Sequence, residues 1–232
     1  MKLTETHIQE LYKFTRKHFV EHYDVQTELV DHLANDIEEI WIENPKLTFE
    51  KARDISFKKF GVFGFMNVVE AKHKQLAKKY NNVIWTFMKE WFSIPKTLIS
   101  ATIFLFFYTL MSLNISEDYL SILLLFIAII DFFLIHQLIK KSKNRFKEKG
   151  KKYLLEDIIY RAGAVSSFLV FSNIFNLTLF LRHSNAVFMK IFVSCLITLA
   201  ILYSYITLFV IPEKGEKLLK ATYPEYRFTK SK

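Results

Sequence analysis

The sequence has a single cysteine, Cys195, among its 232 residues. One thiol cannot form an intramolecular disulfide, so no redox compartment follows from it. The chain also lacks a glycine-rich phosphate loop, the serine elbow of hydrolases and a His-Glu-x-x-His zinc motif. We therefore expect a protein that is not an enzyme and that needs no cofactor.

The N-terminus has no apolar core. Its first residues include Glu5 and Glu10, which fit neither a secretory signal nor an Arg-rich transit peptide. We therefore expect the first apolar run of the chain, which begins near residue 94, to direct insertion into the membrane by itself.

Hydrophobic residues are abundant, at 51% of the chain with 24 Phe, and the excess lies after residue 94. About 20 helical residues cross the ~30 Å hydrocarbon core, and within lipid a helix satisfies its own backbone. Four apolar runs are long enough for this. The sequence predicts a four-helix transmembrane bundle over residues 94–211, with spans near 94–113, 119–139, 162–181 and 187–211.

The net charge of +9 is unevenly placed. The connection 140–161 and the tail 212–232 are rich in Lys and Arg, whereas the connections 114–118 and 182–186 hold one Arg between them. Loops that stay in the cytoplasm carry such an excess. The pattern predicts a multi-pass membrane protein with both termini and the basic loop in the cytoplasm.

The basic loop has two further interpretations, binding of anionic lipid headgroups and binding of nucleic acid. It contains no recognisable DNA-binding unit, so we expect membrane lipid as the partner and no nucleic acid. The lipid-facing basic residues are Lys140, Lys141, Lys143, Arg145, Lys147, Lys149, Lys151 and Lys152.

Residues 1–93 predict a cytoplasmic helical domain. A capping-box pattern at Thr6 and Gln9 predicts the start of its first helix, and Asp24 is the predicted cap of the second. In the second helix the acidic residues fall on nearly the opposite face from an apolar stripe. That stripe consists of Val25, Leu29, Leu33, Ile37 and Ile40.

A third helix is predicted to start at Thr48, and the Gly-Val-Phe-Gly run at 61–64 is predicted to break it. A fourth helix over 65–80 and a turn at Asn81 and Asn82 follow. The Trp-containing piece 83–92 is predicted to be an interfacial helix, or alternatively a continuation of the first span. The expected core face of the third helix is Phe49, Ala52, Ile55, Ser56 and Phe60.

The sequences ELVDHLANDIE at 28–38 and KKFGVFG at 58–64, with the helix start at 48–52 between them, carry a resemblance. Over residues 5–75 the chain resembles the HAAS-type helical signalling domain at the N-terminus of bacterial multi-pass membrane proteins. This resemblance implies an association with PadR-type regulators and with membrane segments.

A cluster of polar side chains on the first two helices is a candidate interaction or metal site. Imidazoles one helical turn apart can share a transition-metal ion, and a neighbouring carboxylate could complete its coordination. The alternative is a set of ordinary polar residues at a helix–helix edge. The cluster comprises His18, His22, Glu28, Asp31, His32 and Asp36.

Asp131 lies inside the second span, where a carboxylate is costly and should face other helices or water. It could fix packing through hydrogen bonds or carry an ion or proton. The expected polar partners are Ser166, Ser167, Asn173, Asn176 and His136.

Together with the resemblance, these features predict an all-α protein of the bacterial inner membrane, with an N-terminal cytoplasmic helical domain, four membrane helices and a basic tail. We expect a regulatory or scaffolding protein that docks a cytoplasmic protein partner on its second and third helices. The alternative is a small transporter, or a transporter accessory, that uses Asp131. A homo-oligomer is left open.

Overall fold

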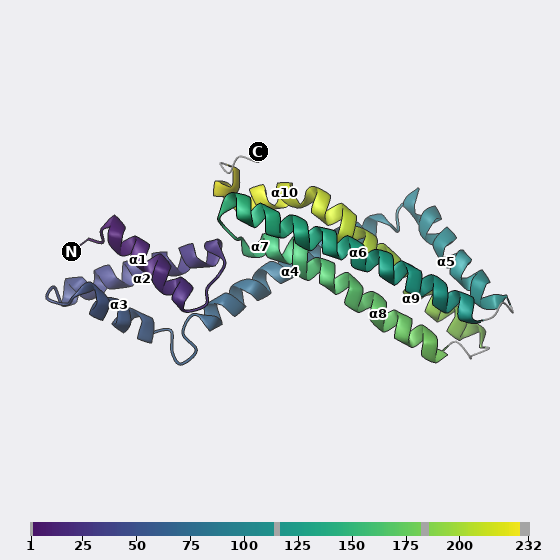
Figure 1. The fold of residues 1–232 in the computed structure, drawn as a ribbon, viewed down its shortest axis with the longest axis horizontal. Helices are drawn as coiled ribbons and strands as arrows, with labels where there is room; N and C mark the ends of the chain where they lie inside the picture. The colour runs from purple at the N-terminus through teal and green to yellow at the C-terminus, as the bar shows by residue number, and fades with distance from the viewer. Residues whose placement is uncertain (1, 114–116, 182–185, 228–232) are drawn as a thin grey trace. The chain divides into compact units, whose positions relative to one another are not determined.

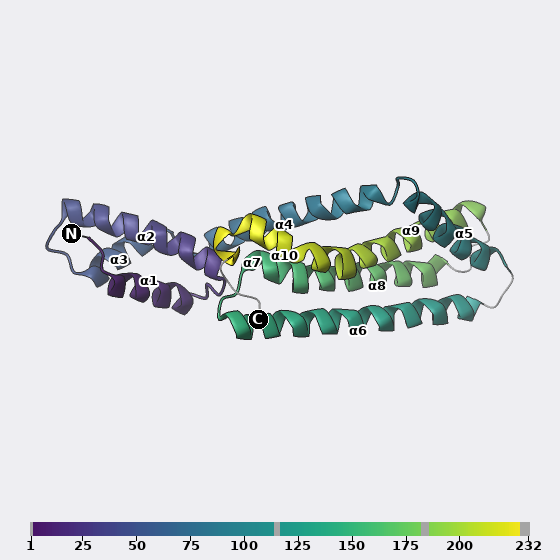
Figure 2. The same cartoon turned by 90° about the horizontal axis from the view of Figure 1, so that it is seen from above.

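The computed structural model describes residues 2–113, 117–181 and 186–227. Every regular element in these ranges is helical (Figures 1 and 2). The chain divides into two compact units. The first unit contains the chain up to Lys78 together with Lys149–Leu154, and the second contains Lys79–Glu148 and the chain from Leu155 onward.

The first unit is built around α2 (Tyr23–Glu43), which packs against α1 (Glu5–Lys17) and α3 (Phe49–Lys58) (Figure 1). The predicted apolar stripe of the second helix is buried throughout, which confirms that this face forms the core. Its residues repeat every three or four positions and so share one side of the helix.

The predicted caps of the first two helices are wrong. Thr4 caps α1: its Oγ1 accepts a hydrogen bond from His7 N at 3.4 Å, and His7 Nδ1 accepts one from Thr4 N at 3.3 Å. The usual pattern has Glu or Gln where His7 stands, so the sequence rule selected Thr6 instead. His22 is the N-cap of α2, and Asp24 lies in its first turn.

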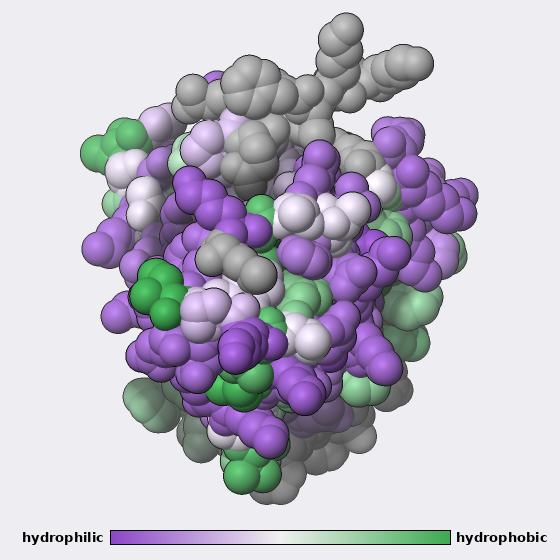
Figure 3. Space-filling model, turned by 90° about the vertical axis from the view of Figure 1, so that its left-hand side faces the viewer, coloured by the Kyte–Doolittle hydropathy of each residue, from purple (hydrophilic) through white to green (hydrophobic). Residues whose placement is uncertain are grey.

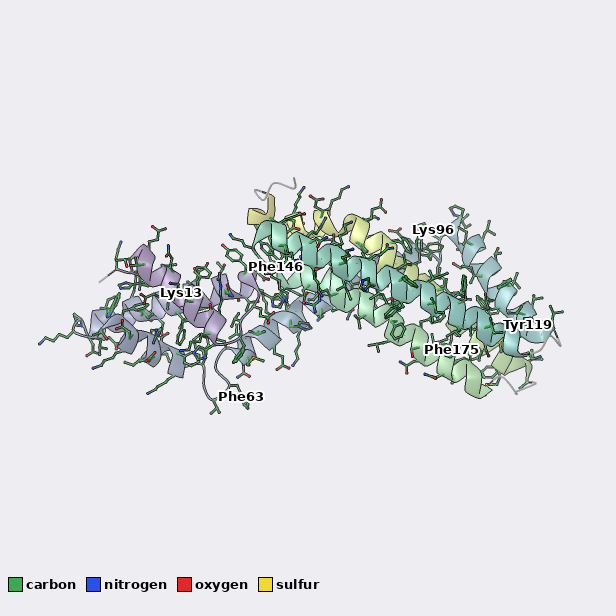
Figure 4. The ribbon with its side chains drawn as sticks, viewed as in Figure 1. Lys13, Phe63, Lys96, Tyr119, Phe146 and Phe175 are labelled. Carbon is green, nitrogen blue, oxygen red and sulfur yellow. The ribbon has the colours of Figure 1, made fainter. Side chains whose placement is uncertain are left out.

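The cap of α3 is confirmed, because Thr48 Oγ1 accepts a hydrogen bond from Lys51 N. Ile55, expected in the core, is 41% exposed. It lies about 100° around the helix from the buried Ser56, so it falls at the edge of the buried face. Beyond α3, Gly61 and Gly64 have φ values of 77° and 53°, as a helix break requires. Between them Phe63 points away from the helices (Figure 4).

Helix α4 (Met66–Glu90) runs through the predicted turn, so the turn at Asn81 and Asn82 and the separate helix 83–92 are wrong. Two Asn residues cost a helix only about 1 kcal/mol together. They are outweighed by a stripe at four-residue spacing. Its members Leu76, Tyr80, Ile84 and Met88 are all buried.

The second unit continues with α5 (Lys96–Ser112), α6 (Glu117–Lys149) and α7 (Leu154–Asp157), followed by the π-helix η1 (Ile158–Ala162) and α8 (Gly163–Leu181). Its last part is α9 (Val187–Tyr205), the π-helix η2 (Ile206–Val210), α10 (Ile211–Thr222) and the 3-10 helix η3 (Pro224–Arg227). Its main core joins Phe107 of α5, Leu124 of α6, Phe171 of α8 and Ile197 of α9.

Among the described residues, three helical stretches are long and apolar enough to cross a membrane: Tyr119–Glu148, Leu154–Thr178 and Val187–Thr222. Helix α5 is also apolar, but it has only 17 residues.

Two boundaries differ from the predicted spans. Helix α6 extends through the basic segment that was predicted to be a loop, because Lys and Arg are good helix formers. The tail predicted from residue 212 begins as α10, which continues directly from η2 and has Pro212 in its first turn.

Candidate functional site

The first turn of α2 binds the short connection between α6 and α7. Tyr23 N donates a hydrogen bond to Lys152 O at 2.7 Å, and Leu154 N donates one to Asp24 Oδ1 at 3.0 Å. The first N–H groups of a helix have no partner within the helix. The Lys152 carbonyl therefore accepts from a backbone N–H that has no partner within α2, and the Leu154 N–H donates to a carboxylate of α2. We call these contacts the α2 clasp.

Side chains strengthen the α2 clasp. Lys152 Nζ lies 3.0 Å from a carboxylate oxygen of Glu21, and Lys151 Nζ lies 3.8 Å from the ring centroid of Tyr23. The ring of Tyr153 meets that of Tyr23 edge to face at 5.8 Å. The adjacent ammonium group of Lys151 lowers the pKa of Tyr23. Lys151 and Lys152, predicted to face lipid, are thus engaged with α2.

Within the second unit, the residues after the connection are bound by the C-terminal part of the chain. Glu156 is buried, and its Oε1 accepts a hydrogen bond from Tyr226 OH at 3.3 Å. Leu155 N donates to Tyr223 OH at 3.2 Å. Burial, and then the charge of Glu156, raise the pKa of Tyr226.

Arg145 completes this buried group. Its Nη1 donates to Tyr160 OH at 3.0 Å and lies 3.7 Å from Glu156 Oε1. A buried carboxylate needs such compensation, because an unpaired charge is costly away from water. Arg145, predicted to face lipid, is half-buried in this role. Of the other predicted lipid-facing residues, Lys140, Lys141, Lys143 and Lys147 are exposed, and the side chain of Lys149 lies outside the described part of the structure.

Asp131 is buried between helices, at 5% exposure. Its Oδ2 accepts a hydrogen bond from Ser167 Oγ of α8 at 3.1 Å. The Ser204 hydroxyl of α9 is buried near the same carboxylate, without a hydrogen bond of normal geometry to any described residue. The carboxylate is thus enclosed by hydroxyl groups from two other helices.

The structure brings only Ser167, of the five expected partners, to Asp131. Asn173 and Asn176 are exposed and donate hydrogen bonds to carbonyls of their own helix. Ser166 Oγ is 2.9 Å from Tyr203 OH, and His136 is exposed.

The predicted His and acid cluster is dispersed. The Glu28 carboxylate pairs with Lys72 at 2.6 Å, and the Asp36 carboxylate pairs with Lys59. Asp31 and His32 are exposed, and His22 is the N-cap of α2. Across the described ranges, no three His, Cys, Asp or Glu side chains form a group that could hold a metal ion.

His18 lies among aromatic rings, with its centroid 4.5 Å from that of Phe14 and 4.4 Å from that of Phe57. Burial lowers the pKa of His18 from 6.5, and the charges of Lys17 and Arg53 add to the shift. The unfolded chain therefore binds this proton more readily than the folded unit does.

We expect the contribution of His18 to the stability of the first unit to be complete above pH 6.5. This contribution should decrease progressively as the pH falls below that value. Hydrogen exchange of α1 and α3 at pH 7.5 and 5.5 would measure the loss. His18→Gln, which does not titrate, should reduce the difference between the two pH values. An unchanged difference in the variant would show that another group causes it.

Comparison of the chain with protein-family models, with curated proteins and with solved structures finds no match.

Proposed function

We propose that this protein is a regulatory or scaffolding membrane protein. Its first unit binds a cytoplasmic protein partner and controls the connection between α6 and α7. The α2 clasp carries this proposal, because it joins α2 to a connection whose two ends continue into candidate membrane helices. The resemblance to HAAS-type signalling domains agrees with such a role, which needs no enzymatic activity.

The partner would bind the solvent face of α2. Asp31, His32, Asn35 and Glu39 are exposed there, opposite the buried stripe. Figure 3 shows that the visible face of the molecule is mainly hydrophilic, with scattered hydrophobic side chains. A partner bound on this face of α2 contacts the helix whose first turn binds Lys152 and Leu154. Binding and the position of the connection can thus be coupled through one rigid element.

The proposal includes four crossings of the bacterial inner membrane, with both termini and the basic segment in the cytoplasm. Helix α5 would be the fourth crossing besides the three longer stretches. Its 17 residues cover about 26 Å, a small mismatch that local thinning of the bilayer can accommodate.

The partner surface can be tested by purifying the full-length chain from its native membrane with cross-linked proteins. We expect a specific protein to be recovered with the wild type and lost with Asp31→Lys, which reverses an exposed charge on α2. Glu10→Lys makes the same reversal on the exposed side of α1 and should leave recovery unchanged. Equal recovery with both variants would contradict docking on α2.

Transport coupled to Asp131 is a second candidate function, favoured by the burial of this carboxylate among hydroxyl groups. If Asp131 only fixes packing, Asp131→Asn should retain stability and function, whereas Asp131→Leu should cost about 1 kcal/mol. If it carries an ion or proton, Asp131→Asn should abolish function in a stable fold. Thermal stability in detergent and a growth phenotype, measured for both variants, separate the two roles.

A further inference from the structure

A pocket of about 450 Å³ lies on one face of α6. Its lining residues come from this helix alone and recur every three or four positions, so they share one side. They are Gln137, Lys140, Lys141, Asn144, Arg145 and Glu148.

The chemistry of the pocket suits an anion. Lys140 and Lys141 are exposed, and neither forms an ion pair with a described residue. The exposed side chains of Gln137 and Asn144 add amide N–H donors. Arg145 is already paired with Glu156, so Lys140 and Lys141 against the single carboxylate of Glu148 leave the lining positively charged.

The position of the pocket along α6 identifies the anion. The apolar part of α6, residues 119–139, covers about 30 Å at 1.5 Å per residue, which matches the hydrocarbon core of a bilayer. Lys140 and Lys141 follow directly and so fall at the level of the phosphate headgroups. Phosphate at this depth belongs to lipid.

The same face of α6 also provides a surface for acyl chains. Phe133, Ile130 and Phe126 precede Gln137 at spacings of three or four residues, which places them on the side that carries the pocket. Their exposed fractions are 63%, 45% and 59%. This stripe of α6 thus carries exposed apolar side chains up to Phe133, followed by the ammonium groups of Lys140 and Lys141, which have no ion-pair partner among the described residues.

We propose that this stripe binds an anionic glycerophospholipid. The phosphate lies between Lys140 and Lys141, the amides of Gln137 and Asn144 bind headgroup oxygens, and the acyl chains lie along Phe133 and Ile130. This site goes beyond the proposed regulatory function and is independent of the partner surface on α2.

The test is native mass spectrometry of the full-length chain in detergent, titrated with phosphatidylglycerol or phosphatidylcholine. We expect retention of phosphatidylglycerol by the wild type and a loss of about tenfold or more in its affinity in Lys140→Gln/Lys141→Gln. Lys143→Gln/Lys147→Gln removes the same charge from exposed positions of α6 outside the pocket and should bind as the wild type does. Unchanged circular dichroism would show that both variants are folded.

Two results would overturn the proposal. Equal losses in both double variants would mean that the charge of α6 attracts lipid without a site. The site would be one for soluble phosphate compounds if two results were found together. Glycerophosphoglycerol, the headgroup without acyl chains, would bind as tightly as the whole lipid, and Phe133→Ser would leave lipid affinity unchanged. Loss of lipid affinity in Phe133→Ser, with weak headgroup binding, supports the acyl-chain stripe.

Discussion

Leu33→Asp is expected to unfold the first unit. Leu33 is fully buried in the stripe of α2, and an ionised carboxylate there would have no partner. Loss of the leucine side chain from a packed core costs about 2–5 kcal/mol before the charge is considered. A unit of this size has a free energy of unfolding of only about 4–13 kcal/mol. Hydrogen exchange of α1, α2 and α3 in the full-length chain should therefore lose its protection.

Asn35→Asp is the matched control, because it adds the same carboxylate two residues further along α2 at an exposed position. Protection should stay close to that of the wild type, within about 0.5 kcal/mol. If Leu33→Asp retained the protection of α1 to α3, the stripe would not be the core of this unit.

Gly163→Ala should strongly destabilise the second unit. A Cβ at Gly163 would lie 2.0 Å from Tyr80 OH and 2.6 Å from Tyr80 Cζ, distances that no packed structure tolerates. Tyr80 is itself buried, at 5% exposure, so its ring has little room to move aside. Forced overpacking of this kind costs about 1–3 kcal/mol or more. The melting temperature in detergent should fall accordingly.

A double-mutant cycle with Tyr80 tests the cause. Tyr80→Ala removes the ring that the new methyl group would strike, so the combined variant should be less destabilised than the sum of the single variants. Tyr80→Phe alone should be nearly neutral, because the Tyr80 hydroxyl is buried without a hydrogen-bond partner in the described residues. Strict additivity of Gly163→Ala and Tyr80→Ala would exclude this contact as the reason for a glycine at position 163.

The features with a local cause were predictable from the sequence. The stripe of α2 follows from helical periodicity, the cap at Thr48 from the chemistry of its hydroxyl, and the break after α3 from Gly61 and Gly64. The long apolar stretches follow from composition, and three of them are candidate membrane crossings in the structure.

The features with a distant cause were not predictable. The sequence pattern predicts Asp24 as a helix cap, but its carboxylate accepts a hydrogen bond from the backbone of Leu154, 130 positions away. Asn81 and Asn82 read as a turn, but the buried stripe on either side of them keeps α4 continuous. The partner of Asp131 was named only within a set of five, because the choice of Ser167 depends on how α6 and α8 pack.

The burial of Glu156 also escaped prediction. Glu156 lies in a charged segment whose composition predicts exposure to solvent, yet the structure places it beside Arg145 and Tyr226. The one sequence signal was the pair of tyrosines Tyr223 and Tyr226 near the C-terminus, whose rings can be buried while their hydroxyls bind polar groups.

We propose that the first unit and the connection that it binds lie on the cytoplasmic side of a four-span protein. Reporter fusions that are active on only one side of the membrane test this directly. We expect a cytoplasmic signal at the N-terminus, after Lys147 and after Lys232, and an external signal for fusions within 114–118 and 182–186. An external signal after Lys147 with a cytoplasmic N-terminus would contradict both the orientation and the α2 clasp, since Glu21 and Lys152 could not then meet.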